Sequence, residues 1–172
     1  DDDRDVATDT VGELIVRGPN VFTGYWMKAE ASAEALRGGW FHTGDLGRMD
    51  AEGFITLVDR KKDMIISGGE NVYPIEVEQV LFRHPAVLDA AVIGGKDSKW
   101  GERVVAIVVA DPATQAPSAE EIVAWCLERL AHFKCPRDVH FVAELPRNAT
   151  GKLLKTELRA QFTGIEGGVV LR

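Results

Sequence analysis

The sequence predicts an α+β fold in two parts. A short β-rich segment comes first, followed from about residue 62 by a compact domain with a small antiparallel sheet and flanking helices. Three observations support this. Strand-like runs and turn residues dominate up to residue 59, and helical periodicity appears after residue 73. Residues 1–59 carry 12 acidic and 5 basic side chains, whereas residues 60–172 carry 15 of each. With 45% hydrophobic and 27% charged residues, the 172-residue chain suits one globular domain or a domain plus a fragment.

The first part is predicted to contain short strands and one helix. An Ala- and Glu-rich run at 28–36 favours the helix, and Gly38-Gly39 would end it. Turn residues at 43–45 and 50–53 separate the strands. The expected strands are 12–17, 40–42, 46–49 and 54–58.

The second part is expected to follow the order β-α-β-β-α-β-α. Pro74 suits the first position of a helix, and Val77, Val80 and Leu81 mark its buried face. Ser118 and Glu121 form a capping-box pattern before the next helix. The expected strands are 64–67, 87–93, 104–109 and 139–142, with a long loop through Trp100 and a last helix at 153–161. Residues 164–172 have no structure-forming pattern.

Composition excludes several classes of protein. No apolar run approaches the roughly 20 residues that span a bilayer. The net charge is −7 and no strong basic face stands out, so a nucleic-acid partner is not expected. Cys126 and Cys135 have neither metal-ligand spacing nor a disulfide framework. A reduced, cytoplasmic protein without a metal site of its own is the simplest interpretation. The chain does not begin with Met, and we expect it to start inside a longer protein.

Two polar clusters in the first part could bind a nucleotide. Asp45 lies in the run Thr43-Gly44-Asp45, which is either an ordinary turn or an acceptor for two ribose hydroxyls. Arg60 is either a solvated surface charge or a donor to the same ribose or to phosphates. Lys62 lies where the composition changes, and this position suggests a hinge.

Glycine and lysine form two further candidate sites. Gly68-Gly69 follows a strand and is either a simple turn or a place where a ligand passes close to the backbone. Lys152 lies in a polar loop after Gly151, where most lysines are merely solvated. Its alternative role is to place a positive charge where a carboxylate meets the α-phosphate of ATP, with the mobile loop delivering it.

Together these clusters resemble one family. The segments 12–25, 41–45, 59–71 and 146–152 resemble adenylate-forming acyl-CoA synthetases, and bacterial fatty-acyl and aryl CoA ligases look most similar. The resemblance covers residues 11–163. It implies that ATP and a carboxylic acid first give acyl-AMP, and that CoA then gives the thioester. It also implies that a small C-terminal domain rotates between the two steps.

The resemblance implies roles for individual residues. Lys152 would act in the first step, Asp45 and Arg60 would bind the ATP ribose, and Lys62 would be the hinge. CoA and its pantetheine arm would lie against Ser67, Gly68, Gly69, Trp100, Phe133 and Lys134. Cys135 replaces a basic residue that some relatives have, which puts nearby contacts to the CoA phosphates in doubt. Lys152 also resembles the position at which several bacterial relatives are acetylated. Either a lysine acetyltransferase acts on it, or it is never modified.

The family's phosphate loop and its Tyr-Gly-x-Thr-Glu segment are absent from the sequence. Residues 1–61 would therefore be the end of the large domain, and residues 62–172 the mobile lid domain. The rest of the large domain, the acyl pocket and the ligands of Mg²⁺ are expected outside this chain. We expect the chain alone to be inactive, and a fatty acid to be the substrate of the whole enzyme. The alternatives are a free-standing non-catalytic binding module and an adenylating enzyme with a carrier-protein acceptor.

Overall fold

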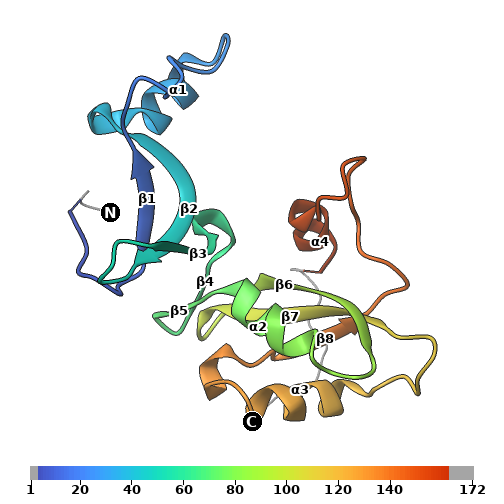
Figure 1. Cartoon of the computed structure of the whole chain (residues 1–172). Coiled ribbons are helices and arrows are strands. Elements are labelled where there is room, and N and C mark those ends of the chain that lie inside the picture. Colours follow the sequence, from blue (N-terminus) through green and yellow to red (C-terminus); the bar gives the residue numbers. More distant parts are fainter. Residues whose placement is uncertain (1–3, 163–172) are drawn as a thin grey trace. The chain divides into compact units, whose positions relative to one another are not determined.

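The computed structural model describes residues 4–162, which form two compact units (Figure 1). The first unit ends at Lys62 and the second begins at Asp63, one residue after the predicted boundary. The elements have the α+β character that the sequence predicts. The expectation for residues 164–172 lies outside the described residues.

The first unit is a three-stranded antiparallel sheet in the order β1-β2-β3. Its strands are β1 (Gly12–Val16), β2 (Phe41–Met49) and β3 (Ile55–Arg60), with α1 (Ala29–Ala35) and the 3-10 turn η1 (Arg37–Gly39) between β1 and β2. The predicted strands at 40–42 and 46–49 belong to one strand, β2, because β1 pairs with it both before and after Thr43-Gly44-Asp45 and β3 pairs with it from Asp45 onward. The register of β1 and β2 shifts at this segment, as in a β-bulge. This segment is therefore not the turn that its composition favours.

The second unit contains a five-stranded sheet in which β7 (Gly101–Ala110) is central. β6 (Val87–Asp97) pairs with β7 along one edge, and the loop between them is only residues 98–100, much shorter than predicted. On the other edge, β4 (Ile65–Ser67) meets β7 at one antiparallel pair, and β8 (Asp138–Phe141) runs parallel to β7. The small antiparallel sheet that was expected is present, and the parallel pairing of β8 is an addition to it. A short strand that was not predicted, β5 (Glu70–Val72), pairs with β4.

Helices cover both faces of the central strands. Alternate residues of β6 and β7, such as Val92 and Ala106, face one core with α2 (Pro74–Leu81) and α3 (Ala119–Leu127). The residues between them, such as Ile93 and Ile107, face a second core with α4 (Lys155–Phe162). Burial on both faces explains why β6 and β7 are almost continuously apolar. Figure 1 shows α4 on one side of the sheet and α2 and α3 on the other.

Local sequence signals set where the helices begin. Pro74 is at the start of α2, as predicted. Ser118 caps α3 with a complete capping box, in which the backbone N–H of Glu121 donates to the Ser118 side chain over 3.2 Å and the backbone N–H of Ser118 donates to Glu121 over 2.7 Å. Such a cap typically stabilises a helix by about 1 kcal/mol.

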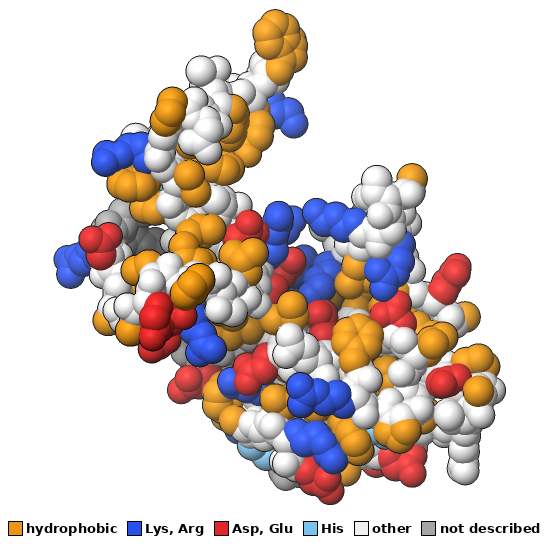
Figure 2. Space-filling view, in the orientation of Figure 1, with side chains coloured by type: hydrophobic (Ala, Val, Ile, Leu, Met, Phe, Trp, Pro, Cys, Tyr) orange, Lys and Arg blue, Asp and Glu red, His pale blue; other side chains and the backbone are white. Residues whose placement is uncertain are grey.

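The first unit exposes many large apolar side chains. Trp26 and Met27 are 89% and 88% exposed, and Phe54 and Leu57 of the β2–β3 hairpin are 72% and 63% exposed. Figure 2 shows hydrophobic side chains over the surface of this unit. Within residues 4–162, no helix is long and apolar enough to cross a membrane.

Candidate functional site

The Thr43-Gly44-Asp45 segment is held in place by β1. The Thr43 hydroxyl donates to the carbonyl of Leu14 over 2.7 Å and accepts the backbone N–H of Asp45 over 3.0 Å. Gly44 has a φ of 72°, a conformation that glycine adopts without strain. These contacts fix the backbone from which the Asp45 carboxylate projects.

Asp45 and Arg60 lie directly opposite each other on β2 and β3. The Arg60 Nε donates to Asp45 Oδ1 over 2.7 Å, and both side chains remain partly exposed. An open hollow of about 310 Å³ beside them is lined by Thr43, Gly44, Arg60, Lys61 and Lys62. The structure thus brings together the carboxylate and the guanidinium for which the resemblance implies binding of one ribose. Three cations line the hollow, and the Asp45 carboxylate is paired with one of them, Arg60. This arrangement suits a ligand with both hydroxyl and phosphate groups.

Glu13 is a contact hub that sequence reasoning missed. One carboxylate oxygen accepts the backbone N–H of Gly44 over 3.1 Å, and the other accepts Lys61 Nζ over 3.0 Å. His42 Nδ1 and Arg37 Nη2 lie 3.5 Å and 3.7 Å from the same second oxygen. A charged residue inside an otherwise apolar strand, Gly12–Val16, was the available signal, because a half-buried charge needs partners.

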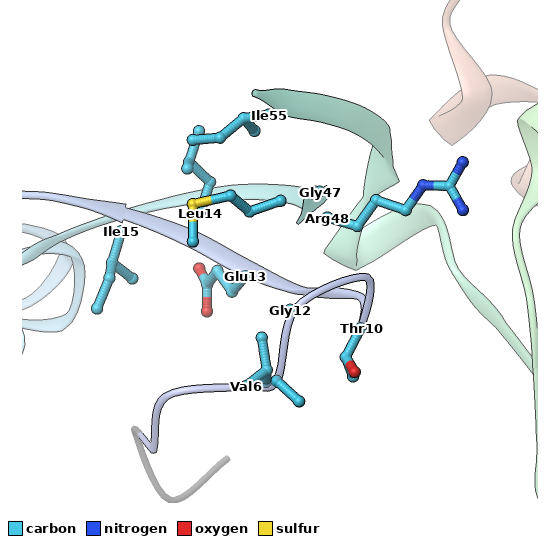
Figure 3. Close-up of a pocket in the computed structure, with 11 residues that line it drawn as sticks. Val6, Thr10, Gly12, Glu13, Leu14, Ile15, Gly47, Arg48 and Ile55 are labelled. Atoms are coloured by element: carbon cyan, nitrogen blue, oxygen red, sulfur yellow. The ribbon is translucent and has the colours of Figure 1, made fainter. Parts of the chain in front are cut away.

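A second hollow in the first unit lies beside β1 and has a volume of about 190 Å³ (Figure 3). Apolar side chains such as Val6, Leu14 and Ile55 make up much of its lining, and Glu13 and Arg48 are its charged members. Arg60 lines the first hollow but not this one. The candidate nucleotide site is therefore the hollow at Arg60.

The predicted hinge residue lies in η2 (Lys61–Asp63), where the two units are joined. The Lys62 side chain is exposed, and it makes no hydrogen bond or ion pair with any residue between 4 and 162. Asp63, the next residue, accepts a hydrogen bond from Arg159 of α4 over 2.7 Å.

In the second unit, Gly68 and Gly69 form the tight turn between β4 and β5. Their φ angles are 63° and 86°, which suits a two-residue hairpin turn. The N–H of Gly68 donates to the carbonyl of Trp100 over 2.9 Å, and a Cβ at Gly68 would lie 2.7 Å from the Trp100 ring. The ring therefore lies on the bare backbone of Gly68. Buried Ser67 pairs with Gly101, next to Trp100, so these predicted CoA residues form one cluster.

Asp97 holds the turn that carries Trp100. Its Oδ1 accepts the backbone N–H groups of Lys99 and Trp100 over 2.8 Å and 2.9 Å. The hydrogen bond from Trp100 is the largest cause of the lowered pKa of the Asp97 carboxyl.

Phe133 and Lys134 lie in η3 (His132–Lys134), which packs against β5. The Phe133 side chain is partly exposed. Lys134 Nζ donates to both carboxylate oxygens of Glu76, over 2.8 Å and 2.7 Å, so this predicted CoA contact already has a partner. Cys135 is buried, and burial raises the pKa of its thiol, so it offers no charge in place of the basic residue that some relatives have.

Lys152 projects from a hydrogen-bonded turn organised by Asn148. The Asn148 side-chain oxygen accepts the backbone N–H groups of Thr150 and Lys152 over 3.0 Å and 2.8 Å. Arg147 pairs with Leu153 across the turn, donates to the carbonyl of Gly151 over 3.0 Å, and binds Asp89 over 2.7 Å. The turn is thus more constrained than the mobile loop that was predicted. The Lys152 ammonium is exposed and has no hydrogen-bond or ion-pair partner among residues 4–162.

Comparison with known proteins identifies the class. Residues 76–152 match the family described as the AMP-binding enzyme C-terminal domain. The chain therefore belongs to the adenylate-forming enzymes and corresponds to the C-terminal portion of their acyl-CoA synthetase members.

Individual relatives show which enzymes of this class the chain is similar to. The chain is 51% identical over 148 residues to a 2-succinylbenzoate–CoA ligase of Bacillus mycoides, covering 86% of this chain and 30% of the relative. The o-succinylbenzoate CoA synthetase of Bacillus subtilis, solved with its acyl-adenylate intermediate, is similar with 44% identity and a TM-score of 0.81 over 95% of this chain and 32% of that one. ATP-bound MatB of Rhodopseudomonas palustris has 39% identity and a TM-score of 0.86 over 92% and 32%. The chain thus spans about a third of the length of the relatives that it matches.

Proposed function

We propose that this chain is the C-terminal part of an ATP-dependent carboxylic acid–CoA ligase. In this proposal residues 1–61 complete the large domain, and residues 62–172 form the lid domain that rotates between two half-reactions. The rest of the large domain would cover the exposed apolar side chains of the first unit. The observation that carries the proposal is the unpaired ammonium of Lys152 on a constrained turn, within a chain whose relatives are CoA ligases.

The two half-reactions place different demands on the lid. In the first, a carboxylate oxygen attacks the α-phosphorus of ATP, and the bond to pyrophosphate breaks with its electron pair. Negative charge concentrates on the oxygens around phosphorus, and the Lys152 ammonium would stabilise it. In the second, the sulfur of CoA, having lost its proton, attacks the acyl carbon, and AMP leaves with the electron pair of the broken C–O bond. Negative charge also develops in that step, but in the proposal the rotated lid has by then carried Lys152 away from it.

Asp45 and Arg60 would hold the ribose of ATP. Asp45 Oδ2 is available for a hydroxyl while Oδ1 accepts from Arg60. Arg60 would retain donors for a phosphate or a ribose oxygen, since guanidinium has five N–H groups. Mg²⁺ would accompany ATP and neutralise phosphate charge. Residues 4–162 contain no group of three His, Cys, Asp or Glu side chains placed to bind a metal ion, and we assign none of its ligands to them.

The cluster of Ser67, Gly68, Gly69 and Trp100 would line the path of the pantetheine arm. Two adjacent glycines let a ligand approach the backbone closely, and the Trp100 ring offers an apolar wall. Phe133 would extend this wall. Lys134 would have to exchange the Glu76 carboxylate for a CoA phosphate, so its contribution would be smaller than that of a free cation.

The identity of the carboxylic acid substrate is the more specific part of the proposal. A fatty acid was expected from the sequence, whereas the relatives with the matches described above are named for 2-succinylbenzoate. We therefore propose an organic carboxylic acid and would test 2-succinylbenzoate beside fatty acids of several lengths. The accessible, unpaired Lys152 also suits modification by a lysine acetyltransferase, which would remove the charge used in the first step.

The experiment uses the complete ligase that carries this chain. Lys152→Ala should slow acyl-AMP formation on the order of 10²–10³-fold, as removal of one electrostatic donor typically does. Thioester formation from supplied acyl-AMP and CoA should be nearly unchanged. Lys96→Ala, which removes another exposed lysine of the second unit, is the matched control. A Lys152→Ala enzyme with normal acyl-AMP synthesis would remove Lys152 from the catalytic residues. A wild-type enzyme that makes no acyl-AMP from any acid tested would refute the proposed function.

A further inference from the structure

The residues on either side of Lys62 are bound to different units. Lys61 Nζ lies 3.0 Å from Glu13 Oε2, and both residues belong to the first unit. Asp63 Oδ1 lies 2.7 Å from Arg159 Nη2, and both belong to the second unit. The exposed Lys62 side chain has no such contact within the described part of the chain. One residue therefore separates two anchored neighbours.

The anchor in the first unit rests on well-supported groups. The Glu13 side chain is 16% exposed and also accepts the N–H of Gly44, next to Asp45. Burial raises the pKa of the Glu13 carboxyl, but the hydrogen bond and charge of Lys61, followed by contacts with Gly44 and His42, outweigh it and lower the pKa overall. Glu13 is therefore ionised at neutral pH and keeps its hold on Lys61.

The anchor in the second unit is equally fixed. Arg159 lies on α4, whose Leu158 and Phe162 are buried in the core against β6 and β7. Asp63 is 13% exposed at its side chain and Arg159 is 29% exposed. Because α4 is held by its core residues, Arg159 restrains Asp63 relative to the second unit.

We propose that Glu13 and Arg159 are positioning residues that confine the domain rotation of the ligase to Lys62. The inference rests on the proposed function, which supplies the rotation. Each residue contributes two soft backbone torsions, so anchoring both neighbours leaves two torsions in place of six. Such a hinge would favour two defined orientations over a broad range of orientations. Because the Glu13 carboxylate contacts both Gly44 and Lys61, it would also hold the ribose-binding segment at a fixed distance from the hinge.

The first test measures backbone amide order in the 172-residue chain by ¹⁵N relaxation. In the wild type, Lys61 and Asp63 should have order parameters near the rigid value of about 0.85, and Lys62 a lower one. Glu13→Gln should bring Lys61 below about 0.6 and leave Asp63 unchanged, and Arg159→Gln should do the reverse. Glu128→Gln, which removes an exposed ion pair with Arg129, should change neither.

Two results would overturn the proposal. One is a wild-type chain in which Lys61, Lys62 and Asp63 are equally mobile. The other is a pair of variants in which Lys61 and Asp63 keep their wild-type order. If Glu13→Gln or Arg159→Gln fails to fold, Lys61→Met and Asp63→Asn remove the same contacts from the opposite partner. These measurements need no catalysis, so their failure is distinct from failure of the proposed function.

The second test uses the complete ligase. Loss of either anchor should change the ratio of the rates of the two half-reactions by at least about threefold, with the acid KM unchanged. Glu13→Gln should also raise the KM for ATP, because Asp45 loses support, whereas Arg159→Gln should not. Identical rate ratios in wild type and both variants would also contradict the proposal, provided the wild type is active.

Discussion

Replacement of Gly68 by Ala tests how closely the Trp100 ring is packed on the β4–β5 turn. The new methyl carbon would lie 2.7 Å from Trp100 Cε3, and ordinary contact begins at 3.4 Å, so the ring has to move. The residue also has a φ of 63°, a left-handed conformation that costs a residue with a side chain about 1–2 kcal/mol. Overpacking typically adds about 1–3 kcal/mol. The lower end is appropriate here because Trp100 is 37% exposed and its ring can shift. We expect a total loss of about 2–3 kcal/mol in the free energy of unfolding.

Gly69→Ala is the matched control. Gly69 has a φ of 86°, but a Cβ there would meet no atom within 4 Å. The control therefore carries the backbone strain without the collision and should lose only about 1–2 kcal/mol. Urea titration of the 172-residue chain, with unfolding monitored by the hydrogen exchange of β6 and β7 amides, gives the free energy of unfolding of both variants. A difference of about 1 kcal/mol separates the midpoints by roughly 0.3–1 M.

Equal midpoints for the two variants would refute the reasoning. They would mean that the Trp100 ring does not rest on Gly68 in solution. In the complete ligase, the same comparison tests the proposed pantetheine path, because Gly68→Ala should slow thioester formation more than Gly69→Ala does.

Three further predictions follow from the hinge, a histidine and a thiol. Lys62→Pro fixes φ near −65° and should reduce the two half-reactions of the complete ligase unequally; equal losses would indicate misfolding. Burial lowers the pKa of His84 below its ordinary 6.5, and its Nδ1 accepts the N–H of Ala86, so the folded state favours the neutral ring. The resulting stabilisation is present above pH 6.5 and is lost as the pH falls toward the folded-state pKa. The urea midpoint should therefore drop more between about pH 7 and about pH 5 in the wild type than in His84→Gln, and parallel declines would contradict this assignment. Burial raises the pKa of the Cys126 thiol to about 12, so iodoacetamide should label it in urea but not in the folded chain; rapid native labelling would show that the site opens.

Local signals explain the parts of the fold that the sequence predicts. Pro74 and the Ser118–Glu121 capping box start α2 and α3 where expected, because caps depend on a few neighbouring residues. The apolar runs of β6 and β7 were recognised for the same reason. Parallel pairing of β8 with β7 was missed, because the choice of edge and direction depends on contacts far apart in the sequence.

Glycine misled the prediction at two places. β6 continues through Gly94 and Gly95, where a Cβ at Gly94 would lie 2.7 Å from the Glu102 side chain on the neighbouring strand. β2 continues through Gly44 because strands pair with it on both sides. In each case partners remote in sequence kept a glycine-containing segment within a strand, although Gly44 itself has a left-handed φ of 72°. Such partners cannot be read from the segment itself.

The candidate site was predicted in part by sequence. The cross-strand pairing of Asp45 with Arg60 and the meeting of Gly68 with Trp100 agree with the roles expected from the resemblance, although those roles themselves stay predictions. The partners that hold these residues, Glu13 for the first cluster and Asp97 for the second, were not expected. Both are acidic side chains that accept backbone N–H groups, and composition alone does not distinguish them from solvated charges.

The Asn148-centred turn determines how Lys152 can reach a substrate. Hydrogen bonds hold the backbone of the lysine at both its N–H and its carbonyl, so only the four-carbon side chain is free to search. Because the backbone of Lys152 is held and its side chain is short, the domain that carries it has to place it accurately. The rate of acyl-AMP formation would then depend on how precisely the lid domain is oriented. A displacement by one side-chain length would leave the Lys152 ammonium too far from the phosphate to stabilise its charge.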